Sequence, residues 1–163
     1  MSPRLEEQTQ TRDLERFRGF LRDGAPGSHY YAVLLGLRTY DLDGLLKIVE
    51  GGFSYAVLEH LQKNARLAPE QLGPLLGIPQ RTLARRKREG RFLPEESDRI
   101  LRFARLFAKA LELFEGTAAA SSAWLTSPQL ALGGAVPIEL AKTDLGLREV
   151  ETLIDRLEHG VFN

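Results

Sequence analysis

The chain has 163 residues, 43% of them hydrophobic, which is enough for one domain or two small ones around a buried core. It has no cysteine, so disulfides, thiolate nucleophiles and cysteine-ligated metals are excluded, as suits a protein of the reducing cytoplasm. The 22 basic and 22 acidic side chains cancel, and no apolar run approaches the ~18 residues of a membrane span. We therefore expect a cytoplasmic protein with no secretory leader and no membrane contact.

The first third of the chain predicts two helices on either side of an ambiguous apolar run. Residues 1–12 are polar and predict a mobile lead, followed by a short helix in "TRDLERFRGFLRDG". The run "SHYYAVLLGL" fits either a strand or a buried helix, because its periodicity does not decide between them. The segment "DLDGLLKIVEGG" then predicts a helix that is capped by Asp41 and stopped by its two final glycines.

From residue 54 the helix signals are sharper. Four segments in succession predict helices: "SYAVLEHLQKNA", "APEQLGPLLG", "PQRTLARRKREG" and "PEESDRILRFARLFAKALELFEG". The third of these is opened by Pro79 and closed by Gly90. The fourth is the longest, and its apolar stripe is wide enough to be central in the fold or shared with a second subunit.

The C-terminal part begins with "TAAASS", the best candidate for a linker between domains. Several short helices are predicted beyond it, two of them started by Ser127-Pro128 and Val136-Pro137. The face of the last helix is defined by Leu147, Val150, Ile154 and Leu157. No segment predicts a strand with confidence, so the fold is predicted to be all-α.

Charge is distributed unevenly along this neutral chain. Residues 79–91 carry six basic side chains and one acidic, a net of +5, whereas residues 117–163 carry three basic and six acidic, a net of −3. This segregation indicates two different partners at two places on the chain.

The basic block coincides with the second helix of a possible helix-turn-helix. This motif needs a small residue where the helices cross, a glycine in the turn, and apolar residues that pin the pair together. The sequence supplies Gly73 and Gly77 for the first two roles, and Leu72, Leu76, Ile78 and Leu83 for the third. A solvated basic helix face without a partner is the alternative interpretation of the charge.

If the motif is present, the second helix presents a set of side chains suited to DNA. The predicted contacts are Gln80, Arg81, Thr82, Arg85, Arg86, Lys87 and Arg88. Arginine reads guanine, glutamine reads adenine, and the methyl group of Ala84 fits against thymine, while Thr82 and Lys87 suit phosphate. Arg86 stands at a position that is usually apolar, so its stem is expected to pack while its charged head escapes to solvent.

From about residue 36 to the C-terminus the chain resembles the Xre/MbcA/ParS-like antitoxins. The resemblance rests on the order and spacing of "RTLARR", "EESDR", "WL" before a proline, "LGG..P", and a closing glycine followed by two apolar residues. It implies an Xre-like helix-turn-helix core with a long central helix, followed by a small helical domain that binds a toxin. The implied divisions are an N-terminal extension of unknown role at 1–35, a DNA-binding and dimerisation domain at 36–116, and a toxin-binding domain at 117–163.

The resemblance also implies the partners of the chain. These are operator DNA, a second copy of the chain, and a RES-domain toxin that consumes NAD⁺, with the antitoxin blocking the toxin active site and repressing its own operon. The implied toxin-binding residues are Trp124, Leu125, Leu132, Gly133, Gly134, Gly160, Val161, Phe162 and Asn163. A chain end can enter an enclosed cleft, where Phe162 would fill an apolar slot and the terminal carboxylate would take the place of cofactor phosphates.

Each of these assignments has an alternative. Residues after a helix-stopping glycine commonly fray, a lone tryptophan such as Trp124 is as often core as interface, and Gly133–Gly134 suits a tight turn better than a phosphate cradle. The three histidines are far apart and no catalytic fingerprint is present, so neither enzyme activity nor a metal or other cofactor is expected. A stand-alone transcriptional regulator and a purely structural interaction module are the competing functions.

Overall fold

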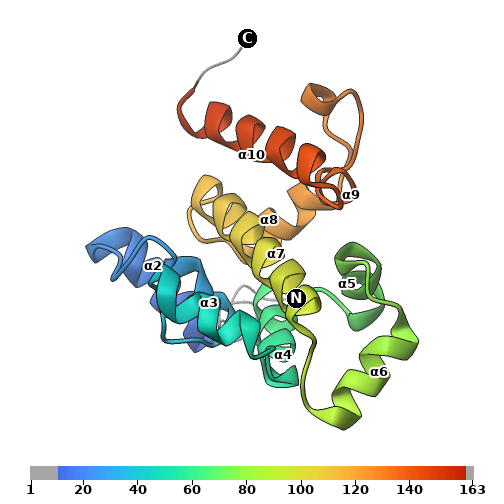
Figure 1. Cartoon of the computed structure of the whole chain (residues 1–163). Helices are drawn as coiled ribbons and strands as arrows, with labels where there is room; N and C mark the ends of the chain where they lie inside the picture. Colours follow the sequence, from blue (N-terminus) through green and yellow to red (C-terminus); the bar gives the residue numbers. More distant parts are fainter. Residues whose placement is uncertain (1–10, 161–163) are drawn as a thin grey trace, which may run out of the picture.

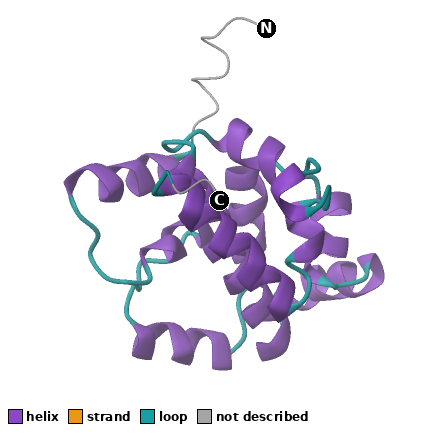
Figure 2. Ribbon diagram, turned by 90° about the horizontal axis from the view of Figure 1, so that it is seen from above, coloured by secondary structure: helices purple, strands orange, loops and turns teal. Residues whose placement is uncertain are grey.

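The computed structural model describes residues 11–160 and is helical throughout, as predicted. Within this range no strand is formed, and the only extended pairing is an isolated bridge between Ser54 and Arg91 (Figure 2). Residues 1–10 of the predicted polar lead at 1–12, and the predicted toxin-contacting residues Val161, Phe162 and Asn163, lie outside the described residues.

The first half of the structure contains α2 (Arg12–Asp23), the 3-10 helix η1 (Tyr30–Leu35), α3 (Leu42–Glu50) and α4 (Tyr55–Ala65). The predicted cap of α3 is confirmed, because the Asp41 carboxylate accepts a hydrogen bond from the Gly44 N–H at 2.9 Å. The ambiguous apolar run is the buried 3-10 helix, which ends at Gly36 in the left-handed conformation.

The second half contains α5 (Pro69–Leu76), α6 (Gln80–Glu89), α7 (Pro94–Leu113), α8 (Ala118–Leu125), the 3-10 helix η2 (Leu130–Leu132), α9 (Pro137–Leu140) and α10 (Asp144–Glu158). The prediction of a linker at "TAAASS" is wrong, because these residues begin α8. Ala118 and Ser121 are buried, and the Ser122 hydroxyl donates a hydrogen bond to the Ala65 carbonyl of α4. Small side chains here allow close helix packing.

The N-terminal helices α2 and η1 belong to the same core as the rest of the molecule. Leu14 and Phe17 of α2 and Leu34 of η1 are fully buried in the main hydrophobic cluster. Buried Asn64 of α4 ties these elements together, because its amide donates to the Leu34 carbonyl at 2.7 Å and to the Asp13 carboxylate at 2.9 Å. Residues 12–35 are therefore integral to the fold that carries α5 and α6.

Helix α7 runs through the centre of the molecule and contacts elements from both halves of the chain (Figure 1). Its buried residues include Ile100, Phe103, Phe107 and Leu111, which agrees with the predicted wide apolar stripe. The pair α5–α6 lies toward the N-terminal end of α7, α10 packs along α7, and α9 packs against α10 and α8 (Figure 1). The two predicted functional surfaces are therefore held apart by one rigid helix.

Candidate DNA-binding and partner-binding surfaces

The turn between α5 and α6 has the close helix crossing that a helix-turn-helix requires. A Cβ atom on Gly73 would lie 2.8 Å from the Gln80 side-chain nitrogen, 3.0 Å from Leu83 Cδ1 and 3.1 Å from the Ile78 carbonyl. Gly77 ends α5 with φ +66°, and the next N–H, of Ile78, donates to the Gly73 carbonyl at 3.0 Å. Both predicted glycine roles are thus visible in the geometry.

Helix α6 buries one side and exposes a basic face on the other. Leu83 and Arg86 point inward, and at 100° per residue the side opposite them carries Arg81, Ala84, Arg85 and Arg88, which are all exposed. Glu89 lies 4.0 Å from Arg85 and is the only acid on this helix. Lys87 is exposed on the flank, where it can reach a phosphate that passes beside the helix.

Three predicted contacts are placed differently from this outward face. Gln80 is exposed, but its amide nitrogen donates to the Pro69 carbonyl at 3.1 Å across the turn, and Thr82 is half-buried. Arg86 is only 7% exposed, and its guanidinium donates to both carboxylate oxygens of Glu96, at 2.7 and 3.3 Å, and to Glu89 at 3.0 Å. Contrary to the prediction, the head of Arg86 does not escape to solvent but is held in this ion pair on the buried side of α6.

The pKa values of both Arg86 and Glu96 are shifted in the direction that favours their charged forms. Its hydrogen bond to Glu96 raises the pKa of Arg86 further above its already high value. Burial raises the pKa of Glu96, but hydrogen bonds from Arg86 and from the Leu93 N–H outweigh it, and the net pKa lies below the ordinary 4.5. The pair therefore stays ionised at neutral pH and fixes α6 to the start of α7.

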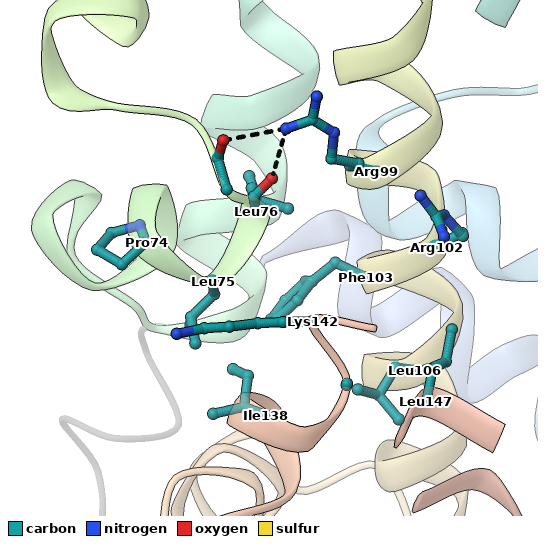
Figure 3. Close-up of a pocket in the computed structure, with 12 residues that line it drawn as sticks. Pro74, Leu75, Leu76, Arg99, Arg102, Phe103, Leu106, Ile138, Lys142 and Leu147 are labelled. Carbon is teal, nitrogen blue, oxygen red and sulfur yellow. Dashed lines mark hydrogen bonds between the residues drawn. The ribbon is translucent and has the colours of Figure 1, made fainter. Parts of the chain in front are cut away.

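The "EESDR" segment at the start of α7 holds the rest of the motif in place. The Ser97 hydroxyl accepts a hydrogen bond from the Phe53 N–H and donates to the Leu93 carbonyl, each at 2.8 Å. Arg99 donates to the carbonyls of Leu76 and Gly77 at 3.2 and 3.0 Å, which caps the C-terminal end of α5 (Figure 3). These roles have no local sequence signal, because each partner lies at least 20 residues away or in the preceding loop.

A cavity of about 360 Å³ separates the helix-turn-helix from the C-terminal helices. Its walls are apolar side chains of α7, α9 and α10, among them Phe103, Ile138 and Leu147, and its rim carries Arg99, Arg102 and Lys142. Lys142 lies across the cavity toward Leu75 at the end of α5 (Figure 3). The turn of the DNA-binding motif and the C-terminal helices thus face each other across a shared hollow.

The C-terminal unit is clamped to α7 by ion pairs and by one close backbone approach. Arg105 and Lys109 of α7 reach Glu151 and Asp155 of α10, at 2.9 and 3.2 Å. Gly146 is required at the start of α10, because a Cβ there would collide with the Leu140 carbonyl. These contacts fix α10 along α7 in one orientation.

Three of the predicted toxin-binding side chains, Trp124, Leu125 and Leu132, pack against other parts of the same chain. Leu125 is 1% exposed, so, contrary to the prediction, it has no free surface for a partner. Trp124 is half-buried and packs against Phe114, with the ring centroids 6.3 Å apart, and Leu132 also packs on the core. Gly133 and Gly134 form an exposed turn with φ of +66° and +86°. Gly160 ends α10 at the surface, also with positive φ.

Within residues 11–160, no group of three or more His, Cys, Asp or Glu side chains is placed to hold a metal ion. In the same range, none of the helices has the length and apolar character to cross a membrane.

Comparison with known proteins matches both halves of the chain to family models. Residues 44–105 match the antitoxin Xre-like helix-turn-helix domain, and residues 109–160 match the antitoxin Xre/MbcA/ParS C-terminal toxin-binding domain. The chain is also 40% identical over 120 residues to "Antitoxin Xre" of Yersinia enterocolitica, covering 73% of this chain and 81% of that protein. It belongs to the Xre/MbcA/ParS antitoxin family.

Two further members of the family are more distant. "Antitoxin Xre" of Photorhabdus laumondii is 30% identical over 117 residues, which is 71% of this chain and 79% of that protein. "Antitoxin Xre" of Pseudomonas putida is 30% identical over 113 residues, 69% of each chain. The two matched domains meet inside α7, and α2 and η1 precede the matched region although they pack in the same core.

Proposed function

We propose that this chain is the antitoxin of a type II toxin–antitoxin pair. It binds a RES-domain toxin that consumes NAD⁺, blocks the toxin active site, and represses its own operon by binding operator DNA. The observation that carries this proposal is that two matched domains meet in the central helix α7. One is a helix-turn-helix with an exposed basic face, and the other is a toxin-binding domain.

On the DNA side, α6 enters the major groove with its outward face. Arg81, Arg85 and Arg88 are exposed and aligned, so they reach base edges, with Ala84 close to the groove floor. Lys87 and Thr82 lie at the sides of this face and suit phosphate oxygens. Gln80 is tied through its nitrogen to the turn, so its oxygen is the atom left to accept from a base.

Two copies of the chain bind one operator as a homodimer. A dimer sets two recognition helices one helical turn of DNA apart, roughly 34 Å, which doubles the contacts and demands a palindromic site. Leu42 and Leu46 on α3 support self-association, because they are 55% and 47% exposed and stand one helical turn apart on the same face.

On the toxin side, the matched C-terminal domain covers the partner and the chain end closes its active site. Gly160 follows the end of α10 at the surface with positive φ, a conformation that stops a helix. In this proposal Phe162 fills an apolar slot of the toxin active site.

Copurification with the product of the adjoining gene and binding to the promoter of that gene pair test the two arms separately. We expect a stable protein complex, and a log affinity for promoter DNA that falls steeply with log salt concentration as phosphate contacts release counterions. A chain that binds the promoter but no adjoining protein would be a stand-alone regulator. A chain that binds the protein but no promoter would be an interaction module without a DNA role.

A further inference from the structure

Leu130 is the most exposed large hydrophobic side chain of the described residues. It is 97% exposed, compared with 74% for Leu145 and 55% for Leu42, the next in order. A leucine in this position gains no burial from the fold of its own chain, although burying it would be favourable. Its neighbour Leu132, two residues further, turns inward onto the core.

The loop that presents Leu130 is held by its own backbone. The Gln129 N–H donates to the Ala135 carbonyl at 3.0 Å, and the Gly134 N–H donates back to the Gln129 carbonyl at 2.9 Å. The Gly133 N–H bonds to Leu130 itself at 3.0 Å. The Gln129 side chain fixes the base of the loop by donating to the Trp124 carbonyl at 3.1 Å. Leu130 therefore stands on an ordered support, and little conformational entropy is lost when a partner covers it.

The segment of chain that presents Leu130 carries no charge. Residues 117–138 contain no Asp, Glu, Lys, Arg or His, although 27% of the whole chain is charged. Covering this segment therefore strips water from no ionised group of its own, which lowers the cost of burying it. The partner surface that matches such a loop is an apolar pocket rather than a charged one.

We infer that Leu130 is the side chain that anchors the toxin, by entering an apolar pocket on the toxin surface. This rests on the proposed function, because the loop lies inside the matched toxin-binding domain. The loop rises beside the N-terminal end of α10, whereas Gly160 ends that helix (Figure 1). The 15 residues of α10 span about 22 Å, which fits within one interface of ordinary size.

In this arrangement the two ends of α10 lie beside elements with different roles. The Leu130 anchor supplies affinity, and the chain end beyond Gly160 supplies inhibition. The predicted site residues in this region were Leu132, Gly133 and Gly134, but Leu132 faces inward and the glycines shape the turn. The residue that contacts the toxin is the leucine that they present.

Affinity for the purified product of the adjoining gene tests the inference, with variants Leu130→Ala and Leu130→Asp. Leu130→Asp is expected to weaken binding on the order of 30-fold or more, and Leu130→Ala by about 10-fold. Thermal unfolding of both variants should match that of the wild type, since the side chain is 97% exposed and buries almost no surface in its own chain. Leu21→Asp is the matched control, a leucine on α2 that is 41% exposed, and should bind the toxin normally.

The outcomes separate the inference from the function on which it rests. If the wild type binds the adjoining product and Leu130→Asp binds it equally well, the anchor is elsewhere and the inference falls while the function stands. If the wild type does not bind it, the proposed function falls and takes the inference with it. A chain that ends at His159 should keep most of its affinity; a loss as large as that of Leu130→Asp would assign the affinity to the tail instead.

Discussion

Arg86 and Glu96 form a two-bond ion pair underneath the predicted recognition helix, with the nitrogen–oxygen distances at 2.7 and 3.3 Å. Both residues are less than a tenth exposed. One arginine of the most basic segment, Arg86, thus holds α6 from its buried side. The other arginines of this helix, Arg81, Arg85 and Arg88, face outward. The pair joins the second helix of the helix-turn-helix to α7, in which the two matched domains meet.

Removing one partner of this pair should destabilise the whole fold. Arg86→Ala and Glu96→Gln each leave a buried group without its partner, and we expect the melting temperature to fall by roughly 6–12 °C. Thermal denaturation measures this, and Arg86→Met combined with Glu96→Leu should recover much of the loss, because neither charge is then buried alone. A variant Arg86→Ala with normal stability but no DNA binding would show that Arg86 is a contact after all.

The crossing of α5 and α6 makes a second prediction at Gly73. Gly73→Ala places a methyl group against Gln80, Leu83 and the Ile78 carbonyl, so we expect a loss of about 1–3 kcal/mol in the free energy of unfolding and weaker DNA binding. Gly19→Ala is the matched control, because Gly19 is also helical but its nearest such neighbour is 3.9 Å away. The control should be neutral or stabilising in urea unfolding; equal behaviour of the two variants would mean that the crossing tolerates a side chain.

Substitutions on the exposed face of α6 can distinguish the proposed contacts to bases from the proposed contacts to phosphates. Arg85→Ala should cost about 1–3 kcal/mol and relax the sequence preference at one base pair of the operator. Lys87→Ala should weaken binding to all sequences alike and lower the salt dependence by about one counterion. Binding to a panel of single-base operator variants at several salt concentrations distinguishes them. Uniform weakening by Arg85→Ala would reassign it to phosphate.

Glu112 near the end of α7 predicts a pH dependence of stability. Burial raises its pKa to about 7, and the nearby acids Glu158 and Asp155 add to the shift. Because the folded state holds the proton of Glu112 more tightly than the unfolded state, the contribution of Glu112 to stability is fully present below the ordinary pKa of 4.5 and is lost as pH rises through about 7.

Urea unfolding at pH 5 and pH 8 tests this assignment. The wild type should lose more stability between these two pH values than Glu112→Gln, whose side chain is uncharged at both. Glu115→Gln removes the same formal charge from an exposed position and should follow the wild type. If Glu112→Gln shows the same loss as the wild type, the pH dependence comes from other groups.

Local signals made much of this fold predictable. The Asp41 cap, the two prolines that open α5 and α7, and the glycines that close α5 and α6 all act within a few residues of their own position. The helix-turn-helix was predictable for the same reason, because its small and apolar positions follow a fixed register.

The remaining features depend on tertiary contacts and gave no local signal. The segment at 117–122 has the small, polar composition of a linker, yet it forms a helix because α4 and α7 pack closely on it. The position of Glu96 in the sequence indicates an acid in the first turn of a helix. Its ion pair with Arg86 forms only through the packing of α6 against α7, so the local sequence does not predict it. The sequence alone does not distinguish Leu130 from the buried leucines near it, and only its exposure in the fold sets it apart.

The most direct test of the account is growth and cellular NAD⁺ content when the adjoining gene is expressed with this chain. The full chain should restore both growth and NAD⁺, and so should Arg85→Ala, since the DNA surface is separate from the toxin surface. The chain that ends at His159 should bind the toxin but fail to protect NAD⁺. If the adjoining gene is harmless when expressed alone, or if the full chain does not protect against it, the antitoxin account is contradicted.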